Sequence, residues 1–493
     1  MERAYQLLHS LSANEKDLFR YSLSYVPKNN KGRSTKLLKL ADFLLSSKKA
    51  PSIHQCLNEV YGIGAEGKKI INLKARLYRR LLDFFISESQ LELNDELDDQ
   101  DYDWIITKKK LAQFYTLFYT GKPQLALQLL NEAFEISKQN EHYYVMIECL
   151  RFKKWIIGLE KGRDVFNSIQ REIARYQNGA ILVSDAVDAM CELGIGSVFT
   201  VKPDTHLLER ALNLVKELRV KNKNVESQVV EYYIQVLEIY ILMTNNDHVK
   251  AEQKCIELEK FIKSHRSVYR KQRIASVFCD LSRCELFLGN FIRANKLAGL
   301  ALEHFPKGGL NYSVAKEHEF YARFYSGDYK SARLSLNDLF GCSENHGSFR
   351  QSKYILFQAC LHFKEREFRK ALNILSSYLE LSKDRTGWDM GIKILKAMCL
   401  IELRLNDEAC RLIEAIRKYI YSHQFDRSFH ARLKIIISLF KKLETSNFVF
   451  TELHKTDHIV EKLDESKKPH SWDFLSPELI PVHKWMMEKL RSK

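Results

Sequence analysis

Residues 275–306, ASVFCDLSRCELFLGNFIRANKLAGLALEHFP, contain the pattern that decides the fold. Apolar residues recur every three or four positions on both sides of Gly289, which is the spacing of amphipathic helices. A glycine between two such stretches predicts a helix end, because glycine adopts the left-handed conformation that closes a helix. Phe291 and Ala294 follow, and we expect the ring to fill the space between the helices while Ala lets the backbones approach. The stretch therefore predicts a packed helix pair.

The same frame, Gly-x-aromatic-x-x-Ala, recurs along the chain. Clear or degenerate copies begin at Gly121, Asn246, Gly289, Gly327, Arg366 and Arg404. The last four intervals are 43, 38, 39 and 38 residues, and the first gap of 125 residues accommodates three units. Gly162 and residues 202–204 break the pattern near the two missing boundaries. One pair cannot bury its own apolar face, so the spacing predicts about eight stacked helix pairs.

The stretch 275–306 resembles a tetratricopeptide repeat over its whole length. The matching positions are Phe278, Leu281, Ser282, Gly289, Phe291, Ala294, Ala298, Ala301 and Pro306. Glu285 departs from the pattern, because the family usually has an aromatic residue there. The resemblance covers about residues 104–440, and the other units are degenerate and longer than the family's usual period. It implies an all-α fold, a right-handed α-solenoid of about eight helix pairs with a concave face that binds ligands.

The chain divides into four predicted parts. Residues 1–90 fit no repeat, and their helical periodicity predicts a small basic helical domain. Residues 91–103 read as an acidic linker, residues 104–440 as the solenoid, and residues 441–493 as a C-terminal helical cap. The apolar residues expected to cover the last exposed face of the solenoid are Trp472, Phe474, Leu475, Ile480, Trp485 and Met486.

Composition supports helices and a basic character. Only 8 Pro and 19 Gly occur in 493 residues, too few for folds that need frequent turns. The net charge is +15, and residues 1–90 carry 16 Lys and Arg against 8 Asp and Glu, a net of +8. Such an excess favours nucleic acid or acidic partners, although a basic solvated face is the commoner explanation.

Features of targeting and redox chemistry point to a reduced cytoplasm, and our leading hypothesis is a bacterial-type cytoplasmic protein. No long apolar run follows Met1, and no stretch is long enough to span a bilayer, so we expect no membrane association. None of the 10 Cys forms a Cys-x-x-Cys pair, and most lie inside apolar helical patterns. We therefore expect neither a disulfide framework nor a metal site.

One glycine-rich stretch resembles a nucleotide-binding loop. Residues 62–69 satisfy Gly-x-Gly-x-x-Gly and nearly satisfy the phosphate-loop pattern. Lys69 replaces the hydroxyl residue that would hold magnesium, and the preceding residues 53–61 have helical rather than strand periodicity. A turn between helices explains the stretch better. No other catalytic motif is present, so we expect a protein that is not an enzyme and has no cofactor.

A basic helix is a candidate nucleic-acid contact. Lys69, Arg76 and Arg80 fall on one side of the predicted helix, and Ile70, Leu73, Leu77 and Leu81 fall on the other. Such a row suits phosphates. The alternative is a solvated helix face, and no helix-turn-helix signature is present.

The resemblance also implies which side chains line the concave face. In the tetratricopeptide family, these lie two, three, six and ten residues before the turn glycine. The corresponding residues here are Tyr240, Met243, Cys279, Arg283, Phe287, Glu317, Tyr321, Phe324, Tyr325, Phe363 and Lys364. Aromatic side chains among Arg and Lys suit an extended acidic or apolar peptide. The alternative is that the aromatic residues belong to the core, one residue out of register.

Two functions follow as hypotheses. The first is a scaffold or adaptor that binds a protein or peptide partner in the concave groove. The second is a nucleic-acid-associated regulator whose basic N-terminal domain contacts DNA or RNA. The sequence leaves the partner, the pathway and the oligomeric state open.

Overall fold

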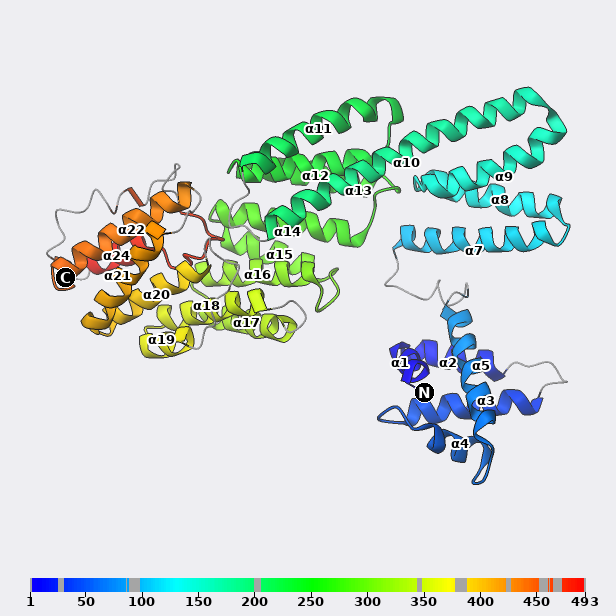
Figure 1. The fold of residues 1–493 in the computed structure, drawn as a ribbon, viewed down its shortest axis with the longest axis horizontal. Helices are drawn as coiled ribbons and strands as arrows, with labels where there is room; N and C mark the ends of the chain where they lie inside the picture. Colours follow the sequence, from blue (N-terminus) through cyan, green and yellow to red (C-terminus); the bar gives the residue numbers. More distant parts are fainter. Residues whose placement is uncertain are drawn as a thin grey trace. The chain divides into compact units, whose positions relative to one another are not determined.

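The chain is all-helical in the residues that its computed structural model describes. These are residues 2–24, 31–85, 87, 98–198, 205–343, 348–376, 388–422, 427–451, 460, 462–463 and 472–491. They form helices joined by turns and contain no strand, which confirms the all-α prediction (Figure 1). None of the helices in these ranges combines the length and apolar character needed to cross a bilayer.

The chain forms two compact units, residues 1–136 and 137–493. The first unit contains α1 (Glu2–Ser10), α2 (Ala13–Ser24), α3 (Lys31–Ser46), α4 (Ile53–Tyr61), α5 (Gly67–Phe85), α7 (Asp99–Tyr119) and most of α8 (Pro123–Gln139). Helices α1 to α5 enclose their own core, which includes Leu8, Phe19, Leu40 and Leu77.

Two boundaries in the first unit follow from local sequence. Ser52 caps α4, because its hydroxyl accepts a hydrogen bond from the Gln55 N–H while the Gln55 side chain bonds the Ser52 N–H. Helix α7 begins at Asp99, inside the stretch predicted as a linker, and Asp99 and Asp101 lie in its first turn. Carboxylates there interact favourably with the positive end of the helix dipole. Residues 91–97 lie outside the described residues.

The second unit continues the helical series. Its helices are α9 (Tyr143–Lys161), α10 (Arg163–Val198), α11 (Thr205–Val225), α12 (Gln228–Thr244), α13 (His248–Ser264), α14 (Lys271–Phe287), α15 (Phe291–Leu302), α16 (Leu310–Tyr325), α17 (Tyr329–Ser343), α18 (Ser348–Lys364), α19 (Phe368–Ser376), α20 (Trp388–Glu402), α21 (Asn406–Ser422), α22 (Arg427–Thr445) and α24 (Val482–Arg491). Each helix from α9 to α21 packs on the next one along the chain. Helices α10 and α12, α14 and α16, and α18 and α20 also touch, so neighbours supply each other's core.

At each of the six positions where a copy of the repeat frame begins, the turn is closed by a residue with positive φ. The φ angle is 79° at Gly289 and 86° at Gly327, and 62° at Arg366 and 56° at Arg404, where the frame lacks glycine. The left-handed turn is therefore kept even where a side chain makes it less favourable. The turn prediction is confirmed at these positions.

Helix α10 departs from the predicted frame. It is a single helix of 36 residues where the spacing of the repeats requires a helix boundary. Gly179 lies within it, but its role is close packing: an added Cβ would lie 2.6 Å from a ring carbon of Tyr143 on α9. Of the two expected breaks, Gly162 does end α9, with a φ angle of 89°. The other, residues 202–204, lies outside the described residues. The number of repeats and the handedness of their stacking stay predictions.

Glu285, where the family usually has an aromatic residue, is fully buried in α14. Its carboxylate lies 2.7 Å from a guanidinium nitrogen of Arg293 and accepts a hydrogen bond of 2.8 Å from Asn290. Both partners belong to the turn and the first part of the next helix. A polar contact thus joins α14 and α15 in place of the expected ring.

Candidate functional site

The predicted groove residues differ in accessibility. Six are at most 8% exposed and pack against neighbouring helices: Met243, Cys279, Glu317, Tyr321, Phe324 and Phe363. The half-buried ones are Tyr240, Arg283, Phe287, Tyr325 and Lys364. Only the half-buried residues can therefore contribute to a surface that a partner contacts, which is fewer than the family spacing implies.

Arg283, Tyr240 and His248 form a polar cluster, named here the Arg283 cluster, because the Arg283 charge acts on both of the other side chains. Buried atoms in each side chain have no hydrogen-bond partner among the described residues: Arg283 Nε, the Tyr240 hydroxyl oxygen and both imidazole nitrogens of His248. The three residues belong to α14, α12 and α13. Buried polar atoms in native proteins are nearly always paired. Their convergence marks this face as the best candidate site.

Electrostatics places Arg283 at the centre of this cluster. Burial raises the pKa of Tyr240, and the Thr244 side chain and then the nearby Arg283 charge oppose that shift. Burial, and then the Arg283 charge, lower the pKa of His248 to about 4, so its imidazole is neutral at pH 7. The Arg283 charge also opposes the rise that burial causes in the pKa of Asp280, which lies at about 6. Arg283 is therefore a positive charge beside the neutral His248 and Tyr240 side chains and the Asp280 carboxyl.

An aromatic wall, Phe287, Phe291 and Tyr325, adjoins the cluster. The Phe287 ring stacks on the imidazole of His248 at a centroid distance of 4.0 Å. All three rings of the wall contact Phe474, at centroid distances of 5.9, 5.9 and 5.0 Å. The wall is therefore already occupied in part by the chain's own C-terminal segment, residues 472–491.

The start of the C-terminal segment is non-helical and is held through its backbone. The Tyr325 hydroxyl donates hydrogen bonds to the carbonyl oxygens of Phe474, at 3.0 Å, and Leu479, at 3.3 Å. Trp472 packs edge-on against Tyr325 with a centroid distance of 5.6 Å. This face thus holds a non-helical peptide stretch by aromatic contacts and bonds to main-chain oxygens.

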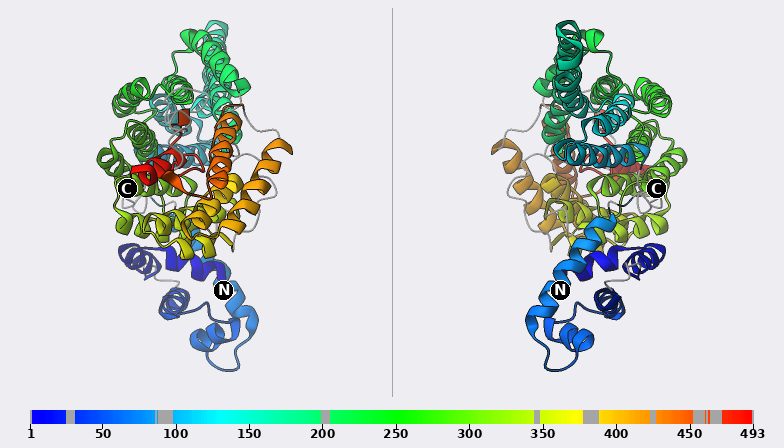
Figure 2. Two further views of the ribbon diagram at one scale, coloured as in Figure 1. Left: turned by 90° about the vertical axis from the view of Figure 1, so that its left-hand side faces the viewer. Right: turned by 90° about the vertical axis from the view of Figure 1, so that its right-hand side faces the viewer.

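Three further contacts anchor the segment to later helices. Arg432 on α22 forms two hydrogen bonds of 2.6 and 2.8 Å with the Glu478 carboxylate. Glu402 on α20 accepts a hydrogen bond of 2.7 Å from the Trp485 indole. Gly391 lies directly under Pro477. Figures 1 and 2 show the red C-terminal helix beside α20 to α22.

The sequence predicted that the apolar residues of this segment cover the end of the helical array. Ile480, Trp485 and Met486 do share a core with residues of α20 to α22, whereas Phe474 reaches back to α14 and α16. The Arg432–Glu478 pair and His248 were missed. A lone Arg, Glu or His carries no local signal of a partner dozens of residues away. Residues 467–470, the predicted break, lie outside the described residues.

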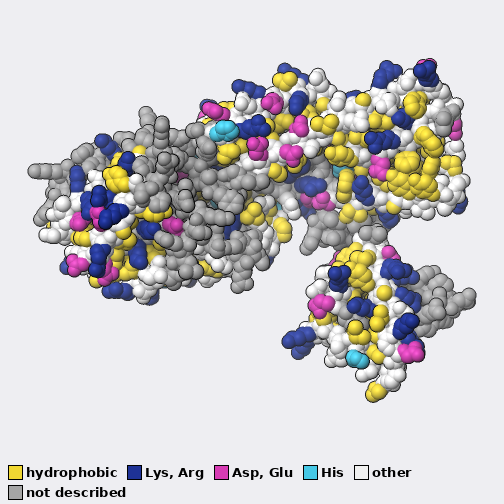
Figure 3. Space-filling model, in the orientation of Figure 1, with side chains coloured by type: hydrophobic (Ala, Val, Ile, Leu, Met, Phe, Trp, Pro, Cys, Tyr) yellow, Lys and Arg dark blue, Asp and Glu magenta, His cyan; other side chains and the backbone are white. Residues whose placement is uncertain are grey.

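The candidate nucleic-acid residues lie on α5 of the first unit. Lys69, Arg76 and Arg80 are exposed, and so is Arg79. Lys69 lies 3.5 Å from a carboxylate oxygen of Glu66, whereas the three arginines form no ion pair within the described part of the chain. Figure 3 shows several Lys and Arg side chains on this unit. The helix therefore presents unpaired charge to solvent.

The glycine-rich stretch is a turn between helices, as predicted. It joins α4 to α5, and Gly62 and Gly64 have φ angles of 88° and 89°. A helix precedes it, so the strand that a phosphate loop requires is replaced by α4.

One group of possible metal ligands occurs at the α18–α19 turn. Ligand atoms of His362, Glu365 and Glu367 lie within 4.8 Å of one another. Each carboxylate already has a cationic partner: Arg333 lies 2.5 Å from Glu365, and Lys370 lies 2.7 Å from Glu367. These ion pairs account for the group without a metal.

Comparison with models of known protein families finds no match for this chain, and comparison with curated proteins finds no significant match.

Proposed function

We propose that this chain is a non-enzymatic scaffold that binds an extended, acidic peptide segment of a protein partner at the Arg283 cluster and aromatic wall. The proposal includes a tetratricopeptide-like stacking of its helix pairs. The observation that carries it is the convergence of unpaired polar atoms from three helices beside rings that already hold a non-helical stretch of the same chain.

The chemistry of the cluster selects the partner. The Arg283 guanidinium, the Tyr240 hydroxyl and one nitrogen of neutral His248 are all donors. A carboxylate supplies two acceptor oxygens for such donors together with a negative charge that Arg283 attracts. An Asp or Glu side chain in the bound peptide fits this requirement.

The neighbouring rings explain why the peptide is extended. Tyr325 bonds to main-chain oxygens of the C-terminal segment, and such bonds are indifferent to side-chain identity. Phe287 and Phe291 add apolar contact area on rigid side chains. A partner peptide would use the same kind of contact, either beside the C-terminal segment or after displacing part of it.

Selection of short random peptides on phage against the full chain tests this proposal. We expect enrichment of peptides that contain Asp or Glu next to an aromatic residue. Arg283→Met should weaken their binding by about 10- to 100-fold, because a hydrogen bond to a charged group contributes about 1.5–3 kcal/mol.

Arg369→Met is the matched control. Arg369 is exposed on α19 and belongs to neither the cluster nor the wall, so binding should be unchanged. If no peptide is enriched, or if the enriched peptides bind Arg283→Met as tightly as the parent chain, the assigned face is wrong.

A second candidate function rests on the unpaired arginines of α5. Arg76, Arg79 and Arg80 lie within five residues on one exposed helix, where they would contact phosphates of a nucleic acid. This is the DNA- or RNA-associated regulator suggested by the basic N-terminal part of the sequence.

Fluorescence anisotropy with a DNA duplex between about 50 and 200 mM salt tests this second candidate. Replacing the three arginines by Ala should lower the slope of log affinity against log salt by about 3, because each neutralised phosphate releases close to one counterion. Lys48→Ala with Lys49→Ala, two exposed lysines outside α5, should leave most of the slope intact. An unchanged slope in the arginine variant would exclude α5 as the contact.

A further inference from the structure

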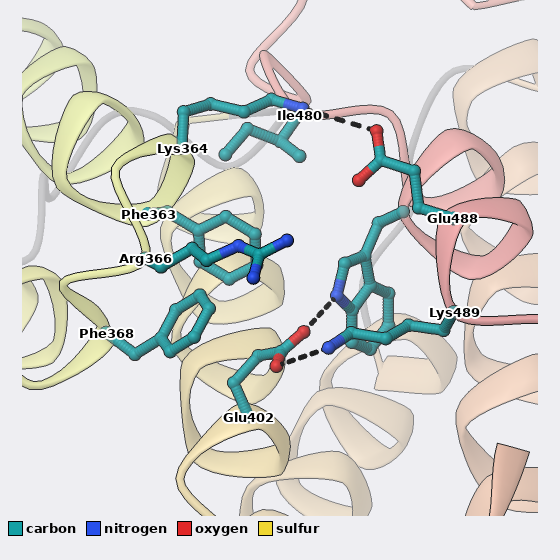
Figure 4. Close-up of a pocket in the computed structure, with 9 residues that line it drawn as sticks. Phe363, Lys364, Arg366, Phe368, Glu402, Ile480, Glu488 and Lys489 are labelled. Atoms are coloured by element: carbon teal, nitrogen blue, oxygen red, sulfur yellow. Dashed lines mark hydrogen bonds and ion pairs between the residues drawn. The ribbon is translucent and has the colours of Figure 1, made fainter. Parts of the chain in front are cut away.

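A cavity of about 320 Å³ lies between the α18–α19 turn, α20 and the C-terminal segment (Figure 4). Its apolar lining consists of Phe363, Phe368, Ile480 and Trp485. The two Phe rings meet edge to face at a centroid distance of 5.0 Å. This volume is at the lower end of the range of small-molecule pockets. No residue of the lining belongs to the Arg283 cluster, so the cavity is a separate feature.

Five charged residues share this lining, and four of them are paired. Glu402 accepts hydrogen bonds of 2.7 Å from both Lys489 and the Trp485 indole. Lys364 lies 3.8 Å from Glu488. Arg366, in contrast, forms no hydrogen bond or ion pair through its side chain with any described residue, and its guanidinium extends beside Phe363 and Phe368 toward the cavity (Figure 4).

The charge of the lining sets the charge of a fitting ligand. Three cations, Lys364, Arg366 and Lys489, face two carboxylates, Glu402 and Glu488, which leaves a net charge of +1. A single negative charge neutralises this excess. A doubly charged phosphate would be repelled by the two carboxylates at close range.

We propose that this cavity binds a small molecule that carries one carboxylate on an aromatic ring. The planar guanidinium of Arg366 matches a carboxylate in two-point geometry. The ring of the ligand packs among Phe363, Phe368 and Trp485, where aromatic groups gain both buried area and favourable edge-to-face contacts.

Ligand binding at this place is coupled to the docking of the C-terminal segment. Ile480, Trp485, Glu488 and Lys489 belong to that segment, and the other lining residues belong to α18, α20 and the α18–α19 turn and its flank. A ligand that needs both sides binds only the docked arrangement and therefore stabilises it. This inference extends the proposed scaffold function and does not depend on the Arg283 cluster.

Calorimetric titration of the full chain with naphthoate tests the proposal, with neutral naphthamide and inorganic phosphate as parallel probes. We expect naphthoate to bind and the two other probes to bind at least about tenfold more weakly. Arg366→Asn should weaken naphthoate by about tenfold or more, and Asn tolerates the φ of 62° at this position. Arg369→Asn, which removes an exposed charge outside the lining, should bind naphthoate like the parent chain.

Several results would overturn this assignment. These are the absence of naphthoate binding, binding that Arg366→Asn leaves unchanged, equal binding of naphthamide, or a preference for phosphate. A circular dichroism melt of Arg366→Asn separates loss of the site from loss of the fold. None of these outcomes bears on the Arg283→Met experiment, so the two proposals fail independently.

Discussion

Replacing Arg432 by Met is expected to lower the free energy of unfolding by about 3–5 kcal/mol. The Arg432 and Glu478 side chains are each 5% exposed, and the guanidinium also donates a hydrogen bond of 2.7 Å to the Leu463 carbonyl. Removing the guanidinium leaves the Glu478 carboxylate buried without its counterion. Urea denaturation followed by circular dichroism measures the loss.

A second substitution identifies the origin of this loss. Glu478→Gln added to Arg432→Met removes the buried charge and keeps an oxygen that accepts the hydrogen bond from the Val482 N–H, which is 2.8 Å in the parent chain. We expect the double variant to recover about 1–3 kcal/mol. Recovery would show that the unpaired charge, rather than lost packing, causes most of the destabilisation.

Arg417→Met is the exposed counterpart. Arg417 also pairs with a carboxylate, that of Glu414, at 2.6 Å, but the two side chains are 43% and 33% exposed. Solvent screens such a pair, so we expect little change in stability. If both variants lose the same free energy of unfolding, burial of the Arg432–Glu478 pair is not the reason why Arg432→Met is destabilising.

Local signals in the sequence were sufficient for the helices and their turns. Ser52 and Gln55 specify the start of α4 within four residues, and Gly289 and Gly327 specify helix ends by their own conformational preference. Arg366 could be placed at the same kind of turn only because the spacing of the repeats is regular. Features that depend on residues close in the sequence could therefore be predicted.

Features that depend on residues far apart in the sequence could not be predicted. Gly179 resembles a helix breaker, yet it serves the approach of Tyr143, 36 residues earlier in the chain. Tyr321 fits the family's ligand-facing position, yet it packs against Phe357 with a centroid distance of 5.2 Å. The family spacing gives the distance from a turn, but the adjacent helices decide whether a side chain stays accessible.

The candidate site also combines features that the sequence predicted with features that it did not. Arg283 and Tyr240 were predicted from their distance to the turns, and the structure places their unpaired atoms in one cluster. His248 follows a turn instead of preceding one, so counting back from the turn residue did not identify it. The occupation of the wall by Phe474 requires the C-terminal segment to return across about 150 residues of chain, which no local pattern encodes.

Gly391→Ala is expected to displace the C-terminal segment and to cost about 1–3 kcal/mol of unfolding free energy. A Cβ at Gly391 would lie 2.5 Å from the Pro477 carbonyl oxygen and 2.6 Å from its Cβ, closer than real atoms approach. Either α20 or residues 472–481 must shift. Limited chymotrypsin digestion should then cleave near Trp472 and Phe474 faster than in the parent chain.

Gly299→Ala provides the control, because Gly299 lies in α15 and an added Cβ meets no atom within 4 Å. Ala is the better helix former there, so stability should rise by about 0.5–1 kcal/mol with no change in digestion.

Displacement of the segment in Gly391→Ala would also uncover Phe287 and Tyr325, so peptides that compete for the aromatic wall should bind this variant more tightly than the parent chain. Faster digestion without tighter binding would show that the wall serves the C-terminal segment alone. Unchanged digestion would show that α20 absorbs the added methyl group and that Gly391 does not control the docking.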